Sequence, residues 1–366
     1  VSRGVVVTKY GHVQPTKRVR IHEAGHPVPD DAGLAGAQAV LNEVRGLEAD
    51  DLIIVVVSGG GSALLPAPVP GITLAEKQAL TKALLACGAD IREMNTIRKH
   101  ISQIKGGQLA RAAAPARVLT LILSDIVGDP LDAIASGPTV PDPTTYQDAL
   151  AILDKYKIRG QVPVSIVKHL EAGAAGKITE TPKPDDPLFT RVENVMVASN
   201  IQALQAAAEA ARVAGLTPMI LSSSIEGETR DIARMHAALG REARETGNPA
   251  PPPVCLISGG ETTVTLKGRG KGGRSQEFVL AAVLDIAGLQ DVVILSAGTD
   301  GTDGPTDAAG AVADGDTLRR AQALGLHPRA ALDDNDAYPF FKHLDDLVIT
   351  GPTRTNVMDV RLVLVG

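Results

Sequence analysis

The chain has 366 residues, which at a typical ~150 residues per domain corresponds to about two domains. Hydrophobic residues make up 44% and charged residues 21% of the chain, so it can bury a sizeable core and is not of the disordered class. Only 2% of the residues are aromatic and the formal net charge is -6, which together argue against nucleic-acid binding and against binding to anionic membranes.

The cysteine content and the absence of long apolar runs restrict the class further. Cys87 and Cys255 are too few for a disulfide framework or a zinc site built from cysteines, and they fit a reducing cytoplasm. No apolar run reaches ~18 residues, and no signal peptide is recognisable. We therefore expect a soluble cytoplasmic α/β protein without a membrane or nucleic-acid partner, and we expect an enzyme.

Short apolar runs alternate along the chain with segments of helical period, which indicates βα units on a parallel sheet. In chain order, strands are predicted at residues 4–8, 52–57, 118–123, 195–198, 218–221, 254–257 and 292–295. The strands at 52–57, 118–123 and 292–295 are continuously apolar, as strands covered on both faces are. Helices are predicted at 74–86, with Thr73 and Glu76 forming a capping box, at 201–214 behind Asn200 and before Gly215, and at 276–286.

Ligands of open parallel sheets bind beyond the carboxyl ends of the strands, so the residues after each predicted strand form the candidate site. Two strands are followed by Gly-rich runs, namely Ser58, Gly59, Gly60, Gly61 and Ser62, and Ser258, Gly259, Gly260 and Glu261. Consecutive glycines let main-chain N–H groups converge on an anion. Ordinary tight turns are the alternative for either run alone, whereas two such runs favour phosphate or carboxylate binding. Neither run has the spacing of a Walker A loop or of a dinucleotide-binding fingerprint.

Acidic residues follow two further strands. Asp125 and Asp129 come after the strand at 118–123, and Gly298, Thr299, Asp300 and Asp303 come after the strand at 292–295. Carboxylates with water ligands are the usual protein ligands of Mg²⁺ beside phosphates. Asp307 belongs to the second of these clusters. Turn formation and helix capping explain any single one of these carboxylates, but we expect one member of each cluster to bind the metal.

Basic residues complete the candidate site. Lys271, Gly273 and Arg274 lie in a glycine loop before the helix at 276–286, where a cation suits a transferring phosphoryl group. A solvated basic turn is an equal alternative on spacing alone. Arg98 and Lys105 lie in a polar segment, residues 95–107, of the kind that binds a carboxylate substrate.

These loops, in this order, resemble those of the class II glycerate kinase family, whose carboxyl-terminal half is called the MOFRL domain. Many of its members carry the older name hydroxypyruvate reductase. The resemblance covers essentially all 366 residues. It rests on residues 23–30, 58–64, 95–105, 124–129, 135–139, 258–261, 272–274, 298–304 and 355–357, the last of which includes Asn356.

The resemblance implies ATP-dependent phosphorylation of D-glycerate to 2-phosphoglycerate with Mg²⁺ or Mn²⁺, and it places the functional arginine of the family at Arg274. It also implies two three-layer α/β/α domains with mostly parallel sheets and an interdomain cleft. We expect a Rossmann-like glycerate kinase domain at residues 1–180 and a MOFRL-type domain at residues 190–366. ATP and D-glycerate are the expected partners, and a homodimer is the candidate assembly.

Three departures from the family pattern qualify this expectation. The family has a Gly-x-Gly-Lys-Ala segment with a catalytic lysine ahead of the region where this sequence starts, so we expect the chain to lack that segment. Ser275 replaces an Asn that is usual after the arginine, and Met358 interrupts the usual Thr-Asn-Val-Asn-Asp ending. The alternatives are an NAD(P)H-dependent hydroxypyruvate reductase, which the missing dinucleotide fingerprint disfavours, and a non-catalytic protein that binds nucleotide or hydroxy acid.

Overall fold

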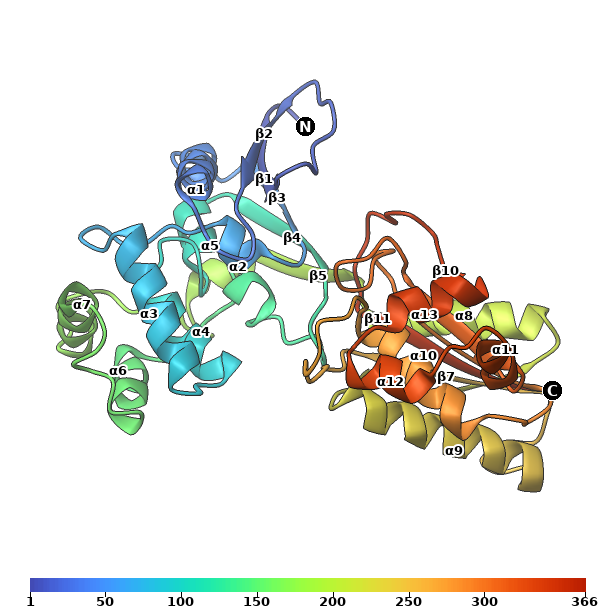
Figure 1. Cartoon of the computed structure of the whole chain (residues 1–366). Coiled ribbons are helices and arrows are strands. Elements are labelled where there is room, and N and C mark those ends of the chain that lie inside the picture. Colours follow the sequence, from blue (N-terminus) through green and yellow to red (C-terminus); the bar gives the residue numbers. More distant parts are fainter. The chain divides into compact units, whose positions relative to one another are not determined.

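The computed structural model describes residues 1–366, which divide into two compact units (Figure 1). The first unit comprises Val1–Ile122 and Pro130–Val197, and the second comprises Leu123–Asp129 and Ala198–Gly366. The chain therefore passes between the units three times, after Ile122, after Asp129 and after Val197. The domain limits 1–180 and 190–366 and the cleft between the domains stay predictions.

The strands of the first unit form two small sheets. β1 (Gly4–Lys9) and β2 (Val19–Ala24) pair in parallel, while β3 (Leu52–Val57), β4 (Arg117–Leu123) and β5 (Val192–Ala198) form a sheet in the order β3-β4-β5. β3 and β4 are parallel, and the predicted limits of β3 are confirmed.

The helices of the first unit pack in two groups. α1 (Asp31–Val44) and α5 (Gln108–Ala113) share a core with β3 and β4, whereas α3 (Leu74–Ala86), α4 (Ile91–His100), α6 (Tyr146–Lys155) and α7 (Val164–Ala174) form a separate helical core. The short helix α2 (Gly61–Leu64) and the 3₁₀ turns η1 (Ile134–Ser136) and η2 (Pro187–Arg191) complete the unit. The capping box of Thr73 and Glu76 at α3 is confirmed.

β3 departs from the expectation that both of its faces are covered. Ile53 and Val55 pack against the core of α1 and α5, but Leu52, Ile54 and Val56 are 55%, 49% and 75% exposed. β3 is an edge strand, and successive side chains of a strand point to opposite faces. A continuously apolar run therefore does not guarantee cover on both faces, because it carries no information about which helices pack on each side.

The second unit is built on one six-stranded sheet in the order β10-β9-β8-β11-β7-β6. Its strands are β6 (Thr217–Ile225), β7 (Val254–Gly260), β8 (Val292–Gly298), β9 (Gly310–Asp314), β10 (Leu347–Val348) and β11 (Asp359–Val365). Only β6 and β7 are parallel; β11 is antiparallel to both β7 and β8, and β9 is antiparallel to β8 and β10. β6, β7, β8 and β10 thus run in one direction, as expected of a mostly parallel sheet, and β9 and β11 run the opposite way. β11 is reversed because it enters at the carboxyl ends of β7 and β8 and must run back between them.

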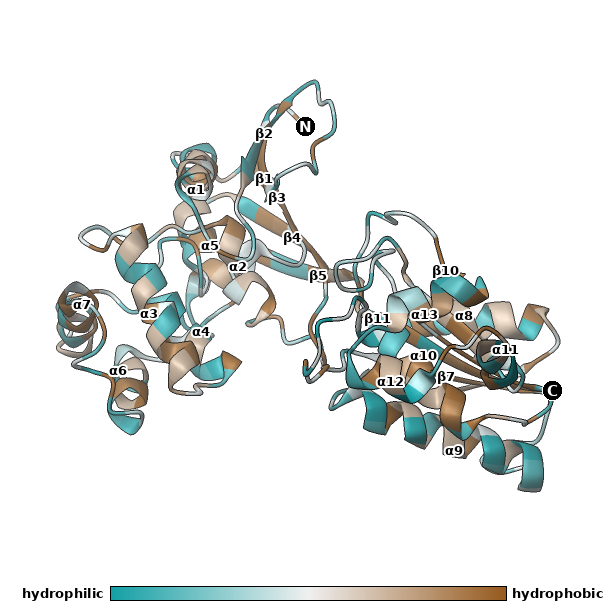
Figure 2. Cartoon of the chain, in the orientation of Figure 1, coloured by the Kyte–Doolittle hydropathy of each residue, from teal (hydrophilic) through white to brown (hydrophobic).

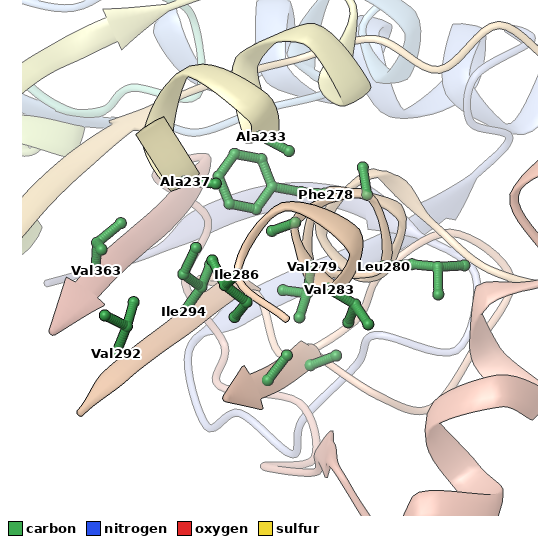
Figure 3. Packing of buried hydrophobic residues seen from close by; sticks show 14 of the residues in the cluster. Ala233, Ala237, Phe278, Val279, Leu280, Val283, Ile286, Val292, Ile294 and Val363 are labelled. Atoms are coloured by element: carbon green, nitrogen blue, oxygen red, sulfur yellow. The ribbon is translucent and has the colours of Figure 1, made fainter. Parts of the chain in front are cut away.

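Helices cover both faces of this sheet, so the second unit has the three expected layers. Alternate residues of β7 face opposite ways: Cys255 and Ile257 pack under α8 (Asn200–Val213), whereas Val254 and Leu256 belong to the core of α9 (Thr229–Thr246) and α10 (Arg274–Asp285). α11 (Thr317–Ala323), α12 (Pro328–Asp333) and α13 (Ala337–Leu344) lie on the side of α10. Figure 3 shows Phe278 of α10 against Ala233 and Ala237 of α9.

The distribution of hydropathy agrees with this layering. In Figure 2 the strands of the second unit are largely hydrophobic, and the outer surface of α9 is hydrophilic. No helix in the structure combines the length and the apolar character that crossing a membrane requires. The α/β class is confirmed.

Candidate active site

The Gly-rich turn after β3 has the geometry of an anion-binding loop. Gly60 adopts a left-handed conformation at φ +81°, and a Cβ there would lie 2.9 Å from the ring of His26. A Cβ on Gly61 would lie 2.8 Å from Cβ of Ala135. Glycine is therefore required at both positions. The amides of Gly60, Gly61 and Ser62 donate to no other main-chain group, so they are free to bind an anion.

A chain of polar contacts connects this turn to α4 and to the segment after it. The Ser62 hydroxyl lies 2.7 Å from the Ser136 hydroxyl, which donates to Oδ1 of Asn95 at 3.1 Å. Nζ of Lys105 donates to the Ser62 carbonyl at 3.1 Å. The structure thus brings Lys105 and the Ser58–Ser62 turn together, as expected for two parts of one site. Arg98 lies on α4 one turn after Asn95, and burial lowers the pKa of its guanidinium.

The second Gly-rich run lies inside a strand, whereas a loop after the strand was expected. Ser258, Gly259 and Gly260 are the last residues of β7, where they pair with Arg361, Val360 and Asp359 of β11. The prediction that they form a loop after the strand is wrong, because antiparallel pairing with β11 extends β7 through them.

Close packing explains the two glycines of this run. A Cβ on Gly259 would collide with the side chain of Asn200, which donates from Nδ2 to the carbonyls of Val357 at 2.7 Å and Asp359 at 3.0 Å. Gly260 has φ +117°, and a Cβ there would collide with the main chain of Ile225. Asn200 was expected directly ahead of a helix, but it is the first residue of α8. Its side chain holds the start of β11 by the two hydrogen bonds to Val357 and Asp359.

Arg274, at the start of α10, is held between two carboxylates. Its Nε donates to Asp359 Oδ2 at 2.8 Å and its Nη2 to Asp359 Oδ1 at 3.1 Å, while its Nη1 binds Glu261. Burial alone lowers the pKa of the guanidinium, but the charges and hydrogen bonds of Asp359 and Glu261 outweigh burial and raise the pKa above its ordinary value. Arg274 is therefore always charged and has a fixed orientation.

Asp359 is shared with a second, fully buried arginine. Arg361 is 1% exposed and donates from Nη2 to Asp359 at 3.1 Å and to Thr262 at 3.2 Å, while its Nε and Nη1 have no partner. Its guanidinium lies 5.5 Å from the centre of the Phe278 ring. Two arginines thus hold one buried carboxylate, which fixes that carboxylate beneath Arg274.

Asp303 caps α10 rather than presenting a free carboxylate. It accepts hydrogen bonds from the amides of Ser275 at 3.1 Å and Gln276 at 2.8 Å. A Cβ on Gly273 would collide with this carboxylate, so the glycine makes room for the cap. Burial raises the pKa of Asp303 to about 6, although the two amides oppose the shift. With both oxygens engaged by amides, Asp303 does not fit the expected role as a metal ligand.

The loop after β8 lies beside the segment before β11. Thr299 donates from its amide to the Met358 carbonyl at 3.0 Å, and its hydroxyl accepts from the amide of Val357 at 2.8 Å. Asn356 accepts from the amide of Met358 at 3.0 Å. Because β11 begins at Asp359, these contacts bring Gly298, Thr299 and Asn356 to the end of the sheet where Arg274 lies.

Lys271 and Asp300 have structural partners. The Lys271 ammonium lies 4.5 Å from the centre of the Tyr338 ring. The carboxylate of Asp300 accepts from the amide of Thr302 at 2.9 Å and from its hydroxyl at 3.1 Å. Lys271 therefore belongs to a contact with α13, and Asp300 to a turn of its own loop.

The remaining predicted metal ligands lie in the segment Leu123–Asp129. Asp129 has φ +52°, and its Oδ1 is buried without a hydrogen-bond partner. Asp125 is engaged in an interaction of its own. No group of three or more His, Cys, Asp or Glu residues in the structure could hold a metal ion.

Three buried charged residues, Asp359, Arg361 and Lys77, were not predicted from the sequence. Asp359 and Arg361 are two residues apart in an otherwise apolar strand, so their side chains point to one face, which is the signal that could have found them. Lys77 shares the face of α3 that buries Leu80 and Leu84, and a lysine on an apolar helical face is a comparable signal.

Comparisons with known proteins show which family the chain resembles. Residues 1–171 match a domain of unknown function (DUF4147), and residues 254–359 match the MOFRL family. The glycerate 2-kinase of Pyrococcus horikoshii is 43% identical over 366 residues, which are 100% of this chain and 82% of that protein. A protein of Agrobacterium vitis that bears the name hydroxypyruvate reductase is 47% identical over 365 residues, 99% of this chain and 81% of its own.

The fold of the chain is also similar to that of a solved glycerate kinase structure. The crystal structure of glycerate kinase from Thermotoga maritima superposes with a TM-score of 0.93 at 43% sequence identity. The superposition covers 100% of this chain and 85% of that protein.

Proposed function

The chain belongs to the glycerate 2-kinase family, and from this membership we propose that it transfers the γ-phosphoryl group of ATP to the 2-hydroxyl of D-glycerate. The observation that carries this function is identity of 43% over the whole chain with D-glycerate 2-kinase of Thermotoga maritima, together with a fold shared at a TM-score of 0.93. The products are ADP and 2-phosphoglycerate.

Arg274 is the proposed catalytic residue of the transfer. The transferring phosphoryl group carries negative charge on its oxygens, and an arginine that contacts it stabilises that charge. Asp359 is 1% exposed, whereas the side chain of Glu261 is 43% exposed. An incoming phosphate would therefore displace Glu261 from Nη1, and Asp359 would keep the guanidinium in place. The catalytic role of Lys271, whose ammonium lies over the Tyr338 ring, stays a prediction.

The Ser58–Ser62 turn is the proposed anion-binding loop of the first unit. The free amides of Gly60, Gly61 and Ser62 supply donors, with Lys105 beneath them. Arg98 supplies a cation on α4. In the second unit, Gly298, Thr299 and Asn356 are proposed to line the site beside Arg274.

Magnesium is proposed to enter as the MgATP complex, as a part of the substrate. Mg²⁺ beside phosphates usually keeps several waters and takes one or two protein carboxylates. The buried Asp129 Oδ1 lacks a partner and fits such a ligand, whereas both oxygens of Asp303 and of Asp300 already accept hydrogen bonds. The bound ion supplies positive charge to the phosphates.

The reductase name of the Agrobacterium vitis proteins describes different chemistry, which requires a nicotinamide dinucleotide. We do not extend that name to this chain, because its Gly-x-Gly-x-x-Gly run, Gly268–Gly273, opens α10 but does not follow a strand directly: residues 261–267 separate it from the end of β7. A cytoplasmic location is proposed, since Cys87 and Cys255 are free thiols and ATP is the co-substrate.

The function is tested by measuring ADP release from the protein expressed from its complete reading frame. We expect turnover with ATP and D-glycerate, and much slower turnover with L-glycerate or glycerol. A parallel assay supplies hydroxypyruvate with NADH or NADPH. Oxidation of the dinucleotide without ADP release would establish a reductase, and binding of ATP without turnover of either kind would establish a binding protein.

A further inference from the structure

Three basic side chains of the first unit lie within range of one another's charge and have no acidic partner. They are Lys77 of α3, Arg98 of α4 and Lys105, which follows α4. Lys77 is 5% exposed and Lys105 is 1% exposed. The side chains of Lys77 and Arg98 form no hydrogen bond or ion pair, and Nζ of Lys105 donates only to the carbonyls of Ser62 and Ala135. We call Lys77, Arg98 and Lys105 the basic cluster.

Neighbouring basic residues show that the fold can pair buried charges. Lys99, also in α4, lies 3.1 Å from Asp132 and 3.5 Å from Asp142. His100, the next residue, lies 3.2 Å from Glu180. The basic cluster is therefore not a general feature of α4, because the residues beside it have carboxylate partners.

Burial and like-charge repulsion both disfavour the charged forms of the two lysines in the basic cluster. Burial and the like charge of Arg98 lower the pKa of Lys77 to about 8. Burial, with the like charges of Lys77 and Arg98, lowers the pKa of Lys105 well below its ordinary value. The charged groups that face Lys77 are thus Arg98 from α4 and Lys105 from the following segment, and no carboxylate is among them. An anion would relieve this repulsion.

The surroundings of the basic cluster are those of a ligand site. Lys105 contacts the main chain of Ser62, whose hydroxyl leads through Ser136 to Asn95. Asn95 and Arg98 lie one turn apart on α4 and so share a face. The free amides of the Ser58–Ser62 turn lie at the same place. Lys105 therefore links the turn to the other two cations, because it contacts Ser62 and lies within range of the charges of Lys77 and Arg98.

We propose that the basic cluster is the subsite for the carboxylate of the acceptor, and that Lys77 is its specificity-determining residue. This inference rests on the proposed function for the identity of the acceptor. The class of acceptor is a small 2-hydroxy carboxylate, and a neutral polyol is rejected because it leaves the buried cations unpaired. ATP phosphates are the other source of an anion, and the experiment distinguishes the two.

The decisive experiment compares Lys77→Met with Lys82→Met, an exposed lysine on the same helix. We expect KM for D-glycerate to rise about 10- to 100-fold in Lys77→Met, the worth of a lost charged hydrogen bond, with KM for ATP unchanged. Tm should be equal or higher, since a buried unpaired charge is removed. Lys77→Arg should recover most of the affinity, and Lys82→Met should match the wild type.

Measuring D-glycerate binding in the absence of ATP tests anion binding by the basic cluster independently of phosphoryl transfer. By calorimetry at pH 8 in buffers of different ionisation enthalpy, D-glycerate should bind with proton uptake, because a bound carboxylate raises the pKa of Lys77. Lys77→Met should bind it weakly with smaller uptake. Inorganic phosphate serves as a second probe, so anion binding is measured even if kinase turnover fails.

Two outcomes would overturn the inference. A rise in KM for ATP alone in Lys77→Met would assign the basic cluster to the nucleotide. Unchanged KM for both substrates, with unchanged anion binding and a lowered Tm, would make Lys77 a structural residue. Failure of the proposed function itself would appear differently, as a wild-type protein without ADP release from D-glycerate.

Discussion

At the scale of single residues, Arg274 is the group on which the chemistry depends. The glycine loop and its two basic residues indicated a role in phosphoryl transfer, and the structure distinguishes them. Arg274 contacts Asp359 and Glu261 through all three guanidinium nitrogens, whereas Lys271 lies over an aromatic ring. Spacing alone does not separate two cations three residues apart, because the difference comes from β11 and α13, far away in the chain.

Arg274→Ala should lower kcat by about 10² or more, since a donor that contacts the developing charge is lost. KM for D-glycerate should stay near the wild-type value. Arg269→Ala is the matched control, because that arginine is exposed in the same loop. Steady-state kinetics of both variants check the prediction, and equal kcat in the two variants would remove Arg274 from the transfer step.

The partner carboxylates of Arg274 show where sequence reasoning reaches its limit. Glu261 was predicted, since it follows the Gly-rich run, but Asp359 was missed. The register of β11 places Asp359 opposite Gly260 of β7 on one side and Gly298 of β8 on the other. Asp359 is 99 positions after Gly260 and 61 after Gly298, and no local pattern in the sequence encodes pairing over such separations.

At the scale of elements, sequence patterns within a few residues predicted the α3 helix and its capping box correctly. The capping box of α3 depends on residues three positions apart, and the predicted helix limits are confirmed. The Ser58–Ser62 turn follows β3 as expected. Ser258, Gly259 and Gly260 instead continue β7, because the strand that extends it is the last element of the chain. Two runs with nearly the same sequence thus have different structures.

Gly259→Ala should lower the free energy of unfolding by about 1–3 kcal/mol or more, because the added methyl group collides with Asn200. Gly160→Ala is the control, since a Cβ there meets nothing within 4 Å. Urea denaturation measures both. A fully stable Gly259→Ala variant with weakened ATP binding would restore the anion-binding interpretation of this run.

The cap of α10 should make stability depend on pH in a defined direction. The pKa of Asp303 is raised to about 6 in the folded protein, whereas the carboxyl of the unfolded chain has its ordinary pKa of 3.8. Between these values the folded state holds a proton that the unfolded state has lost, so stability falls as pH rises from 4 to 6.

Comparison of the wild type with Asp303→Asn isolates this titration from the others. The stability of the wild type relative to the variant should fall by about 2–3 kcal/mol between pH 4 and pH 7. Denaturation curves at several pH values measure the difference. A constant difference would show that the two amides of α10 keep the carboxylate ionised throughout.

At the scale of the whole molecule, each unit carries its own group of proposed site residues. The first unit carries the basic cluster and the Ser58–Ser62 turn, and the second carries Arg274 with its carboxylates. The order of the loops along the chain was enough to identify the family. The antiparallel strand β11 and the single covered face of β3 were not foreseen, since both depend on contacts between distant segments.

Effects of Lys77→Met and Arg274→Ala should multiply if they act on separate groups, one on the acceptor carboxylate and one on the transferring phosphoryl group. The double variant should then lose kcat/KM by the product of the two single losses, within a factor of about 2. A double variant no worse than Arg274→Ala alone would show that both residues serve the same group.

The most direct measurement is the position of phosphate on the product. Phosphorus and proton NMR of a reaction with ATP and D-glycerate should show ADP and a phosphate ester on carbon 2 as the only organic products. An ester on carbon 3 would contradict the proposed acceptor geometry. Unchanged ATP, together with dinucleotide-dependent reduction of hydroxypyruvate, would contradict the kinase assignment as a whole.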